Sequence, residues 1–165
     1  MIQIYDDIIT GEESTKIKEL LLGNEFSWYY LSDITGHEDR RPGFSHYFVT
    51  KDGKINSPYS EIISNIIFNS CKKINHELKE VTMSRAFLQL PIRYTGDRID
   101  THHIDKEEPH TVVLYYVNDS DGDTVIGEQR VTPKQGRVVI FDGSIYHAGS
   151  QPHQSPRCII NSHIA

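Results

Sequence analysis

The stretch 111-TVVLYYVNDSDGDTVIGEQRVTPKQGRVVIFDGSIYH-147 decides the fold of this chain. Apolar and β-branched runs of about four to eight residues alternate in it with turns rich in Gly, Pro and Asp. Short strands at this spacing are typical of a β-sandwich or jelly roll. The pattern extends to both sides, and we predict strands at about 81–92, 98–103, 111–118, 123–127, 129–132, 137–142, 145–148 and 157–163, with a turn at Thr95-Gly96-Asp97.

The first part of the chain has a different pattern and predicts helices. Residues 1–9 alternate well enough for an opening strand, and residues 45–50 for another. Thr10 and Glu13 have the spacing of a capping box, which predicts a helix that ends at Gly23. A second helix, from about 58 to 78, is predicted by an apolar stripe at helical spacing: Ile62, Ile63, Ile66, Ile67 and Cys71.

Composition excludes several classes of protein. The chain has 165 residues, 37% of them hydrophobic and 24% charged, and a net charge of −6. No apolar run approaches the roughly 18 residues of a membrane span, and no basic stripe predicts a nucleic-acid surface. The N-terminus shows no secretory signal, so we expect a cytoplasmic protein. The two cysteines, Cys71 and Cys158, are expected to be reduced thiols.

The motif His103-Ile104-Asp105 ends one of the predicted strands. Strand residues two apart point to the same side, so this imidazole and this carboxylate can converge on one metal ion. A third ligand is predicted at His147, which follows the tight turn Asp142-Gly143-Ser144. The other candidates are weaker, because His102 would face away, His153 lies in a loop, and His163 is close enough to the C-terminus to fray.

A second His-x-Asp, His37-Glu38-Asp39, serves as an internal comparison. A metal pair needs rigid support on both sides, and no apolar alternation flanks this one. We therefore predict a solvated loop there, although the region 34–44 is expected to contribute to a substrate-binding surface.

Two histidines and one carboxylate form the facial triad of non-haem Fe(II) oxygenases. These ligands hold a ferrous ion and leave positions open for other molecules. Zinc is the alternative, but a zinc hydrolase would need a general base, and no His-Glu-x-x-His helix supplies one. Arg157, ten residues after His147, could pair with a carboxylate through both of its amino groups.

In this order, the motifs resemble those of 2-oxoglutarate and Fe(II)-dependent oxygenases of the prolyl-4-hydroxylase-like type, including small phage-encoded members. The resembling residues are His103-Ile104-Asp105, His110 to Asp119, Asp121 to Thr124, Pro133 to Gly143, His147 and Arg157. They lie within residues 81–163. One departure is Asp123, where many relatives carry a second glycine.

The resemblance implies a mostly β protein with N-terminal helices, built on a double-stranded β-helix (jelly roll, cupin-like). We expect a single domain over 1–165, with a helical support region of about 1–80 and the β-helix core at about 81–163. It implies His103, Asp105 and His147 as metal ligands, with no catalytic residue beyond them. Arg157 and Tyr116 are expected to hold 2-oxoglutarate, and Tyr94 is a further candidate.

The implied activity is a dioxygenase reaction that hydroxylates a C–H bond, with succinate and CO2 as coproducts. Fe(II) is the implied metal, 2-oxoglutarate and O2 are the cosubstrates, and ascorbate is a further candidate cofactor. The implied substrate is a prolyl residue of a peptide or protein. The alternative is a metal-binding cupin-like protein, or another metalloenzyme, that does not turn over 2-oxoglutarate. The sequence does not determine the oligomeric state.

Overall fold

The computed structural model describes residues 1–93 and 98–165. The predicted turn at 95–97 and the candidate Tyr94 lie outside the described residues. The elements in chain order are β1 (Ile2–Tyr5), α1 (Gly11–Leu21), β2 (Tyr29–Leu31), β3 (Gly43–Val49), α2 (Ile62–Ile74), β4 (Val81–Gln89), β5 (Thr111–Tyr116), β6 (Thr124–Ile126), β7 (Gln129–Val131), β8 (Val138–Asp142), β9 (His147–Gly149) and β10 (Arg157–Ile164).

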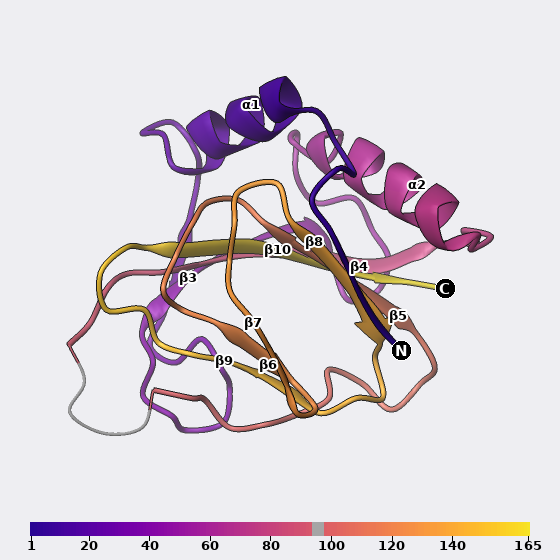
Figure 1. The fold of residues 1–165 in the computed structure, drawn as a ribbon. Helices are drawn as coiled ribbons and strands as arrows, with labels where there is room; N and C mark the ends of the chain where they lie inside the picture. The colour runs from indigo at the N-terminus through magenta and orange to yellow at the C-terminus, as the bar shows by residue number, and fades with distance from the viewer. Residues whose placement is uncertain (94–97) are drawn as a thin grey trace.

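Two antiparallel sheets form the body of the molecule (Figure 1). The larger sheet has the strand order β1-β8-β5-β10-β4-β3-β2, and the smaller has the order β7-β6-β9. The C-terminal strand β10 therefore lies inside the large sheet, where it pairs with β5 on one side and β4 on the other. A strand bonded on both edges is held in place along its length, which makes β10 a rigid platform for the side chains that it carries.

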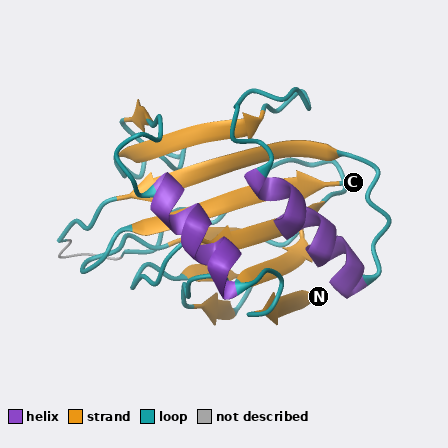
Figure 2. Ribbon diagram, turned by 90° about the horizontal axis from the view of Figure 1, so that it is seen from above, coloured by secondary structure: helices purple, strands orange, loops and turns teal. Residues whose placement is uncertain are grey.

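Strand alternation gives the large sheet two different faces. Along β5, Val113 and Tyr115 pack into a core beneath the helices, whereas Leu114 and Tyr116 pack into a second core facing the small sheet. The alternation of side chains along a strand accounts for this division of β5. Figure 2 shows both helices lying across one face of the large sheet, which leaves the other face to the small sheet and the site described below.

The helices form for local reasons that the sequence contains. Thr10 and Glu13 make the predicted capping box, because the Glu13 amide donates to Thr10 Oγ1 and the Thr10 amide donates to Glu13 Oε2. Helix α2 buries the predicted stripe but is shorter than expected, since it ends at Asn75 in a left-handed conformation. None of the described helices is long and apolar enough to cross a membrane.

The strand predictions were mostly right, with two exceptions. Strand β2 was not predicted; it pairs only with β3 and its tyrosines are exposed. The predicted strand at 98–103 is wrong, because this segment makes only isolated bridges from Ile99 to Ser150 and from His103 to His147. A segment that bridges at single points can bend, and the bend places the residues after His103 over the large sheet.

Candidate metal centre

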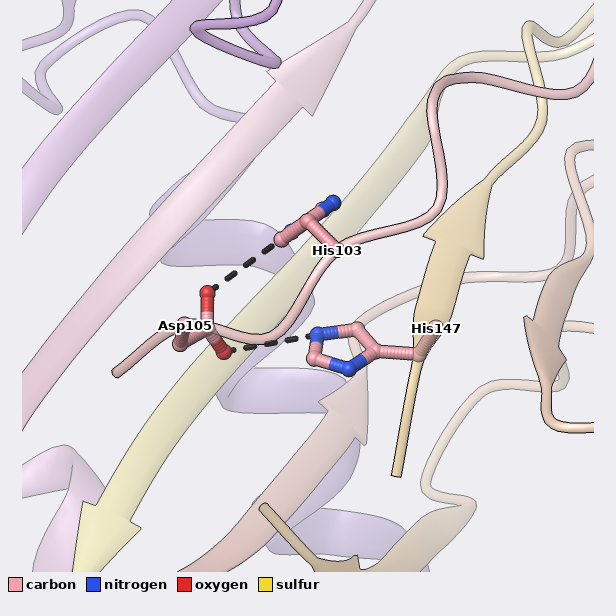
Figure 3. A group of neighbouring side chains, drawn as sticks. All are labelled: His103, Asp105 and His147. Atoms are coloured by element: carbon pink, nitrogen blue, oxygen red, sulfur yellow. Dashed lines mark ion pairs between the residues drawn. The ribbon is translucent and has the colours of Figure 1, made fainter. Parts of the chain in front are cut away.

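The three predicted ligands come together at one point (Figure 3). His147 begins β9, and two backbone hydrogen bonds link it to His103: the His103 amide donates to the His147 carbonyl at 3.0 Å, and the reverse bond is 2.9 Å. Asp105 follows on the same bent segment. One ligand atom from each residue lies within 4.8 Å of the other two, a separation that a single ion can bridge. The backbone thus holds both histidines, although they are far apart in sequence.

The hydrogen bonds of the two histidines leave Nε2 as the nitrogen of each ring that can bind a metal. His103 Nδ1 lies 3.0 Å from the Thr101 carbonyl, and His147 Nδ1 lies 3.1 Å from the Ile145 carbonyl. A carbonyl can only accept, so each Nδ1 carries a proton, and in a neutral ring Nε2 is then the nitrogen with a lone pair for a metal. Burial lowers the pKa of His103 and so favours its neutral form. This is the arrangement in which metal-binding histidines are usually held.

Asp105 is held in position by residues of β10. Its Oδ2 accepts hydrogen bonds from Asn161 Nδ2 at 3.2 Å and from His163 Nε2 at 2.9 Å. Its Oδ1 lies 3.8 Å from His103 Nε2. Burial raises the pKa of Asp105, but its interactions with the side chains of His147 and His163 outweigh burial, and the net pKa is lowered. The carboxylate is therefore ionised, as a ligand must be.

The expectation that His163 would fray is wrong. Its side chain is 4% exposed and contacts Asp105, because β10 is sandwiched between two strands up to Ile164. Asp105, His110 and His163 form a second group that could hold an ion. However, the His110 ring packs closely against Gly143. A Cβ atom added to that glycine would lie 2.1 Å from His110 Nε2, so this nitrogen faces the backbone of Gly143. His110 also does not line the cavity described next, so we favour the first group.

A cavity of about 690 Å³ connects the three ligands with Arg157. Arg157 is 5% exposed. It donates to three neutral acceptors: the Gly122 carbonyl at 2.8 Å, Gln89 Oε1 at 3.1 Å and Thr124 Oγ1 at 2.8 Å. In the described part of the chain no carboxylate lies within ion-pair distance of it. The carboxylates of Asp100 and Asp123 act on Arg157 only at longer range. Burial of a guanidinium without a contacting carboxylate is costly, so this geometry favours an anionic ligand in the cavity.

Tyr116 does not contact Arg157 through a hydrogen bond of its own and is linked to it through Thr124. Its hydroxyl donates to Thr124 Oγ1 at 2.8 Å, and Thr124 in turn accepts from Arg157. Tyr116 is fully buried and is not among the residues that line the cavity. Gln89 and Thr124, which do line it, were missed by the sequence reasoning, because single Gln and Thr residues on strands carry no recognisable motif.

The loop with the second His-x-Asp packs onto the first. The His37 ring lies 4.9 Å from the His103 ring, and Asp39 accepts hydrogen bonds from the Thr101 amide and hydroxyl at 2.9 and 2.8 Å. Among the described residues, the groups that could hold a metal ion do not include His37 or Asp39. The loop is nevertheless anchored rather than simply solvated, and a buried ion pair of 2.8 Å joins Arg41 at its end to Asp100.

Solved structures share this architecture. An oxidoreductase of the 2OG-Fe(II) oxygenase family from Burkholderia pseudomallei has a TM-score of 0.73 at 15% identity, over 99% of this chain and 84% of that one. The chain has the fold of the 2OG-Fe(II) oxygenases. The predicted mostly β jelly roll with two helices is thereby confirmed.

Two further structures with this fold are named as prolyl hydroxylases. The viral collagen prolyl hydroxylase of Paramecium bursaria Chlorella virus-1, in its 2OG complex, has a TM-score of 0.64 at 12% identity, over 99% of this chain and 94% of that one. A prolyl hydroxylase from Trichoplax adhaerens, in complex with a hypoxia inducible factor peptide, has a TM-score of 0.68 at 15% identity, over 99% and 82%. No family model and no curated protein matches the sequence. At these identities the 2OG-Fe(II) oxygenase likeness establishes the fold alone.

Proposed function

We propose that this protein is a non-haem Fe(II), 2-oxoglutarate-dependent dioxygenase that hydroxylates a substrate C–H bond. The observation that carries the proposal is that two imidazoles, one carboxylate and an arginine with no ion-pair partner in residues 1–93 and 98–165 all line one cavity. The donor set suits Fe(II), since two neutral imidazoles and a carboxylate are the ligands of this class of oxygenase. His103, Asp105 and His147 would hold the ion.

The residues of this chain would divide the work between them. His103, Asp105 and His147 would hold an iron ion that, with 2-oxoglutarate and O2, would supply the oxidising chemistry, with succinate and CO2 as coproducts. Arg157 would bind the distal carboxylate of 2-oxoglutarate and orient the molecule along the cavity, with Gln89 and Thr124 fixing the guanidinium. Tyr116 would support Thr124 from behind. Asn161 and His163 would hold Oδ2 of Asp105.

As the substrate we propose a prolyl residue of a peptide or protein. The support is the fold shared with a viral collagen prolyl hydroxylase and with a prolyl hydroxylase in complex with a peptide. The loop that carries His37 and the segment after Asp105 both line the cavity and would contact the substrate. Oxygen insertion is tested by mass detection of a one-oxygen gain across a panel of proline-containing peptides.

The competing function is metal binding in a cupin-like protein that does not use 2-oxoglutarate. A metal-binding protein of that kind has no need for Arg157 buried without a counter-ion in the same cavity. An anaerobic titration separates the two. Wild-type protein with Fe(II) and 2-oxoglutarate should give a weak visible charge-transfer band, and His103→Ala should abolish it. His102→Ala, a change at the exposed neighbouring residue, should leave the band intact. Protein that binds Fe(II) without a band or 2-oxoglutarate affinity would support the cupin-like alternative.

A further inference from the structure

One wall of the cavity carries positive charges that have no ion-pair partner. Lys51, Arg85 and Lys106 all line the cavity, and none of them pairs with a carboxylate of residues 1–93 or 98–165. Lys106 Nζ donates only to the Thr82 hydroxyl, at 3.0 Å. The chain as a whole has a net charge of −6, so unpaired cations gathered on one wall are not a consequence of composition.

The carboxylates that also line the cavity have other roles. Asp105 belongs to the metal group, and Asp100 pairs with Arg41. Asp33 accepts hydrogen bonds from Thr35 and from the Arg41 amide within its own loop. Glu108 is exposed. Among the described residues, none of these carboxylates forms an ion pair with Lys51, Arg85 or Lys106.

Arg85 is the most constrained of the three cations. Its guanidinium carbon lies 4.7 Å from the centre of the Tyr47 ring and 4.2 Å from that of the Phe87 ring. Its Nε is buried and has no hydrogen-bond partner. Burial lowers the pKa of Arg85, opposed by the Tyr47 hydroxyl and the Asp105 carboxylate. Two aromatic contacts fix the plane of a guanidinium and so prepare it for a planar partner such as a carboxylate.

Arg85 lies at the level of the metal group and away from Arg157. In the pairing of β10 with β4, Arg157 is opposite Gln89, whereas Arg85 is opposite Asn161, which donates to Asp105. Four residues of strand separate the two positions, or about 13 Å at about 3.3 Å per residue. The two arginines therefore serve different parts of the cavity, and an anion held by Arg157 leaves Arg85 available.

We propose that Arg85, framed by Tyr47 and Phe87, binds a carboxylate carried by the substrate, with Lys51 and Lys106 extending the same positive wall. This inference rests on the proposed function, and it narrows the substrate class to acids that place a carboxylate beside the reacting carbon. The carboxylate can come from the free α-carboxyl group of a small proline derivative or from an acidic side chain next to the proline of a peptide. Arg85 recognises the same planar anion in both.

The test compares acids with matched neutral compounds. The first pair is N-acetyl-L-proline and its methyl amide, and the second is a short peptide with Glu beside proline and the same peptide with Gln. Succinate formation and one-oxygen gain are measured with Fe(II)-loaded protein. We expect turnover of the acid in at least one pair, and that pair identifies the source of the carboxylate. Arg85→Gln should raise the KM for that acid by about tenfold to a hundredfold, the range of a charge-assisted bidentate contact.

Two further variants separate recognition from structure. Arg85→Lys keeps the charge and should restore part of the lost affinity. Lys72→Gln removes a cation that lies 4.2 Å from the Phe68 ring on α2, outside the cavity, and should not change the KM. The affinity of Arg85→Gln for 2-oxoglutarate should stay within about twofold of the wild-type affinity, because Arg85 is not expected to contact 2-oxoglutarate.

Three results would overturn the inference. One is that protein that binds 2-oxoglutarate shows no preference for the acid in either pair. This result includes the case in which it turns over neither compound of a pair. The second is an equal KM for the acid in wild type and Arg85→Gln. The third is a loss of 2-oxoglutarate affinity in Arg85→Gln as large as the loss of substrate affinity. Failure of the proposed function itself looks different, because wild-type protein would then not bind 2-oxoglutarate at all.

Discussion

The two faces of strand β10 differ in chemistry, although their residues alternate along the same eight positions. Toward the helices, Cys158, Ile160 and Ile164 pack into an apolar core. Toward the small sheet, Arg157, Asn161 and His163 line the cavity. Both sets are buried, so burial does not distinguish them. What differs is the chemistry of the buried groups: one face is apolar, whereas the other carries polar side chains and Arg157, which has no ion-pair partner among the described residues.

This difference shows how one strand can combine a stabilising apolar face with a polar face that lines a ligand cavity. Packing on the helix side fixes the register of β10, and a slip by one residue would move Arg157 into the apolar core. The stable face therefore determines where the polar face points. Mutations on the two faces should consequently separate stability from ligand binding.

The largest effect is expected for Asp105→Ala. Loss of a ligand should lower Fe(II) affinity by more than about 100-fold, beyond the 10–100-fold typical of residues that only support a ligand. Metal affinity is measured anaerobically by titration with Fe(II), and thermal unfolding of the metal-free protein serves as the control. If the metal-free variant unfolds at a far lower temperature than metal-free wild type, Asp105 has a structural role, and the proposed separation of stability from ligand binding fails.

On the opposite face, Ile160→Ala should cost about 2–5 kcal/mol of folding free energy, since it removes a fully buried side chain. Denaturant unfolding measures this cost. At a temperature where the variant is still folded, its affinity for 2-oxoglutarate should match that of wild type. An affinity that falls in proportion to stability would show that the two faces are not separable.

Arg157→Ala should weaken 2-oxoglutarate binding far more than iron binding. A charge-assisted bidentate pair contributes roughly 1.5–3 kcal/mol, or about tenfold to a hundredfold in affinity. Separate titrations with Fe(II) and with 2-oxoglutarate on the metal-loaded protein give the two numbers. Equal losses of both affinities would mean that Arg157 has a structural role.

The smallest effect is expected outside both faces, at Asp6. Arg137 lowers the pKa of Asp6 to about 2, together with Lys134. Because the pKa of Asp6 is lower in the folded than in the unfolded protein, its carboxylate stabilises the folded protein at pH values above the ordinary aspartate pKa. This stabilisation is lost as pH falls toward 2. Asp6→Asn should lower stability at pH 7 by at most about 1 kcal/mol, because the pair is partly exposed.

The difference between wild type and Asp6→Asn should shrink between about pH 4 and pH 2, as followed by denaturant unfolding. Succinate formation at pH 7 should be unchanged. A difference that persists at pH 2 would assign the effect to something other than the charge of Asp6.

Much of this arrangement is predictable from the sequence because strand alternation is a local property. The pattern around Leu114 and Tyr116 separates the two faces, and His-x-Asp with a later histidine identifies three side chains that the structure brings together. The capping box at Thr10 was equally local. These features can be predicted from the neighbouring residues in the sequence alone.

The rest depends on contacts between distant segments. His163 was expected to fray because distance from the C-terminus was the only guide, whereas pairing of β10 with β4 and β5 holds it beside Asp105. Residues 98–103 look like a strand, but among the described residues their β-pairing is limited to isolated bridges. Arg85 was not singled out, since its aromatic frame comes partly from β3. The assignment of the whole chain to one domain remains a prediction.

The most direct test of the central claim is the conversion of 2-oxoglutarate to succinate by the Fe(II)-loaded protein, with a panel of proline-containing compounds. We predict succinate formation that requires Fe(II) and 2-oxoglutarate, matched by a one-oxygen gain in the accepted compound, and lost in His147→Ala. Protein that is folded and binds Fe(II) but neither binds 2-oxoglutarate nor forms succinate would contradict the account.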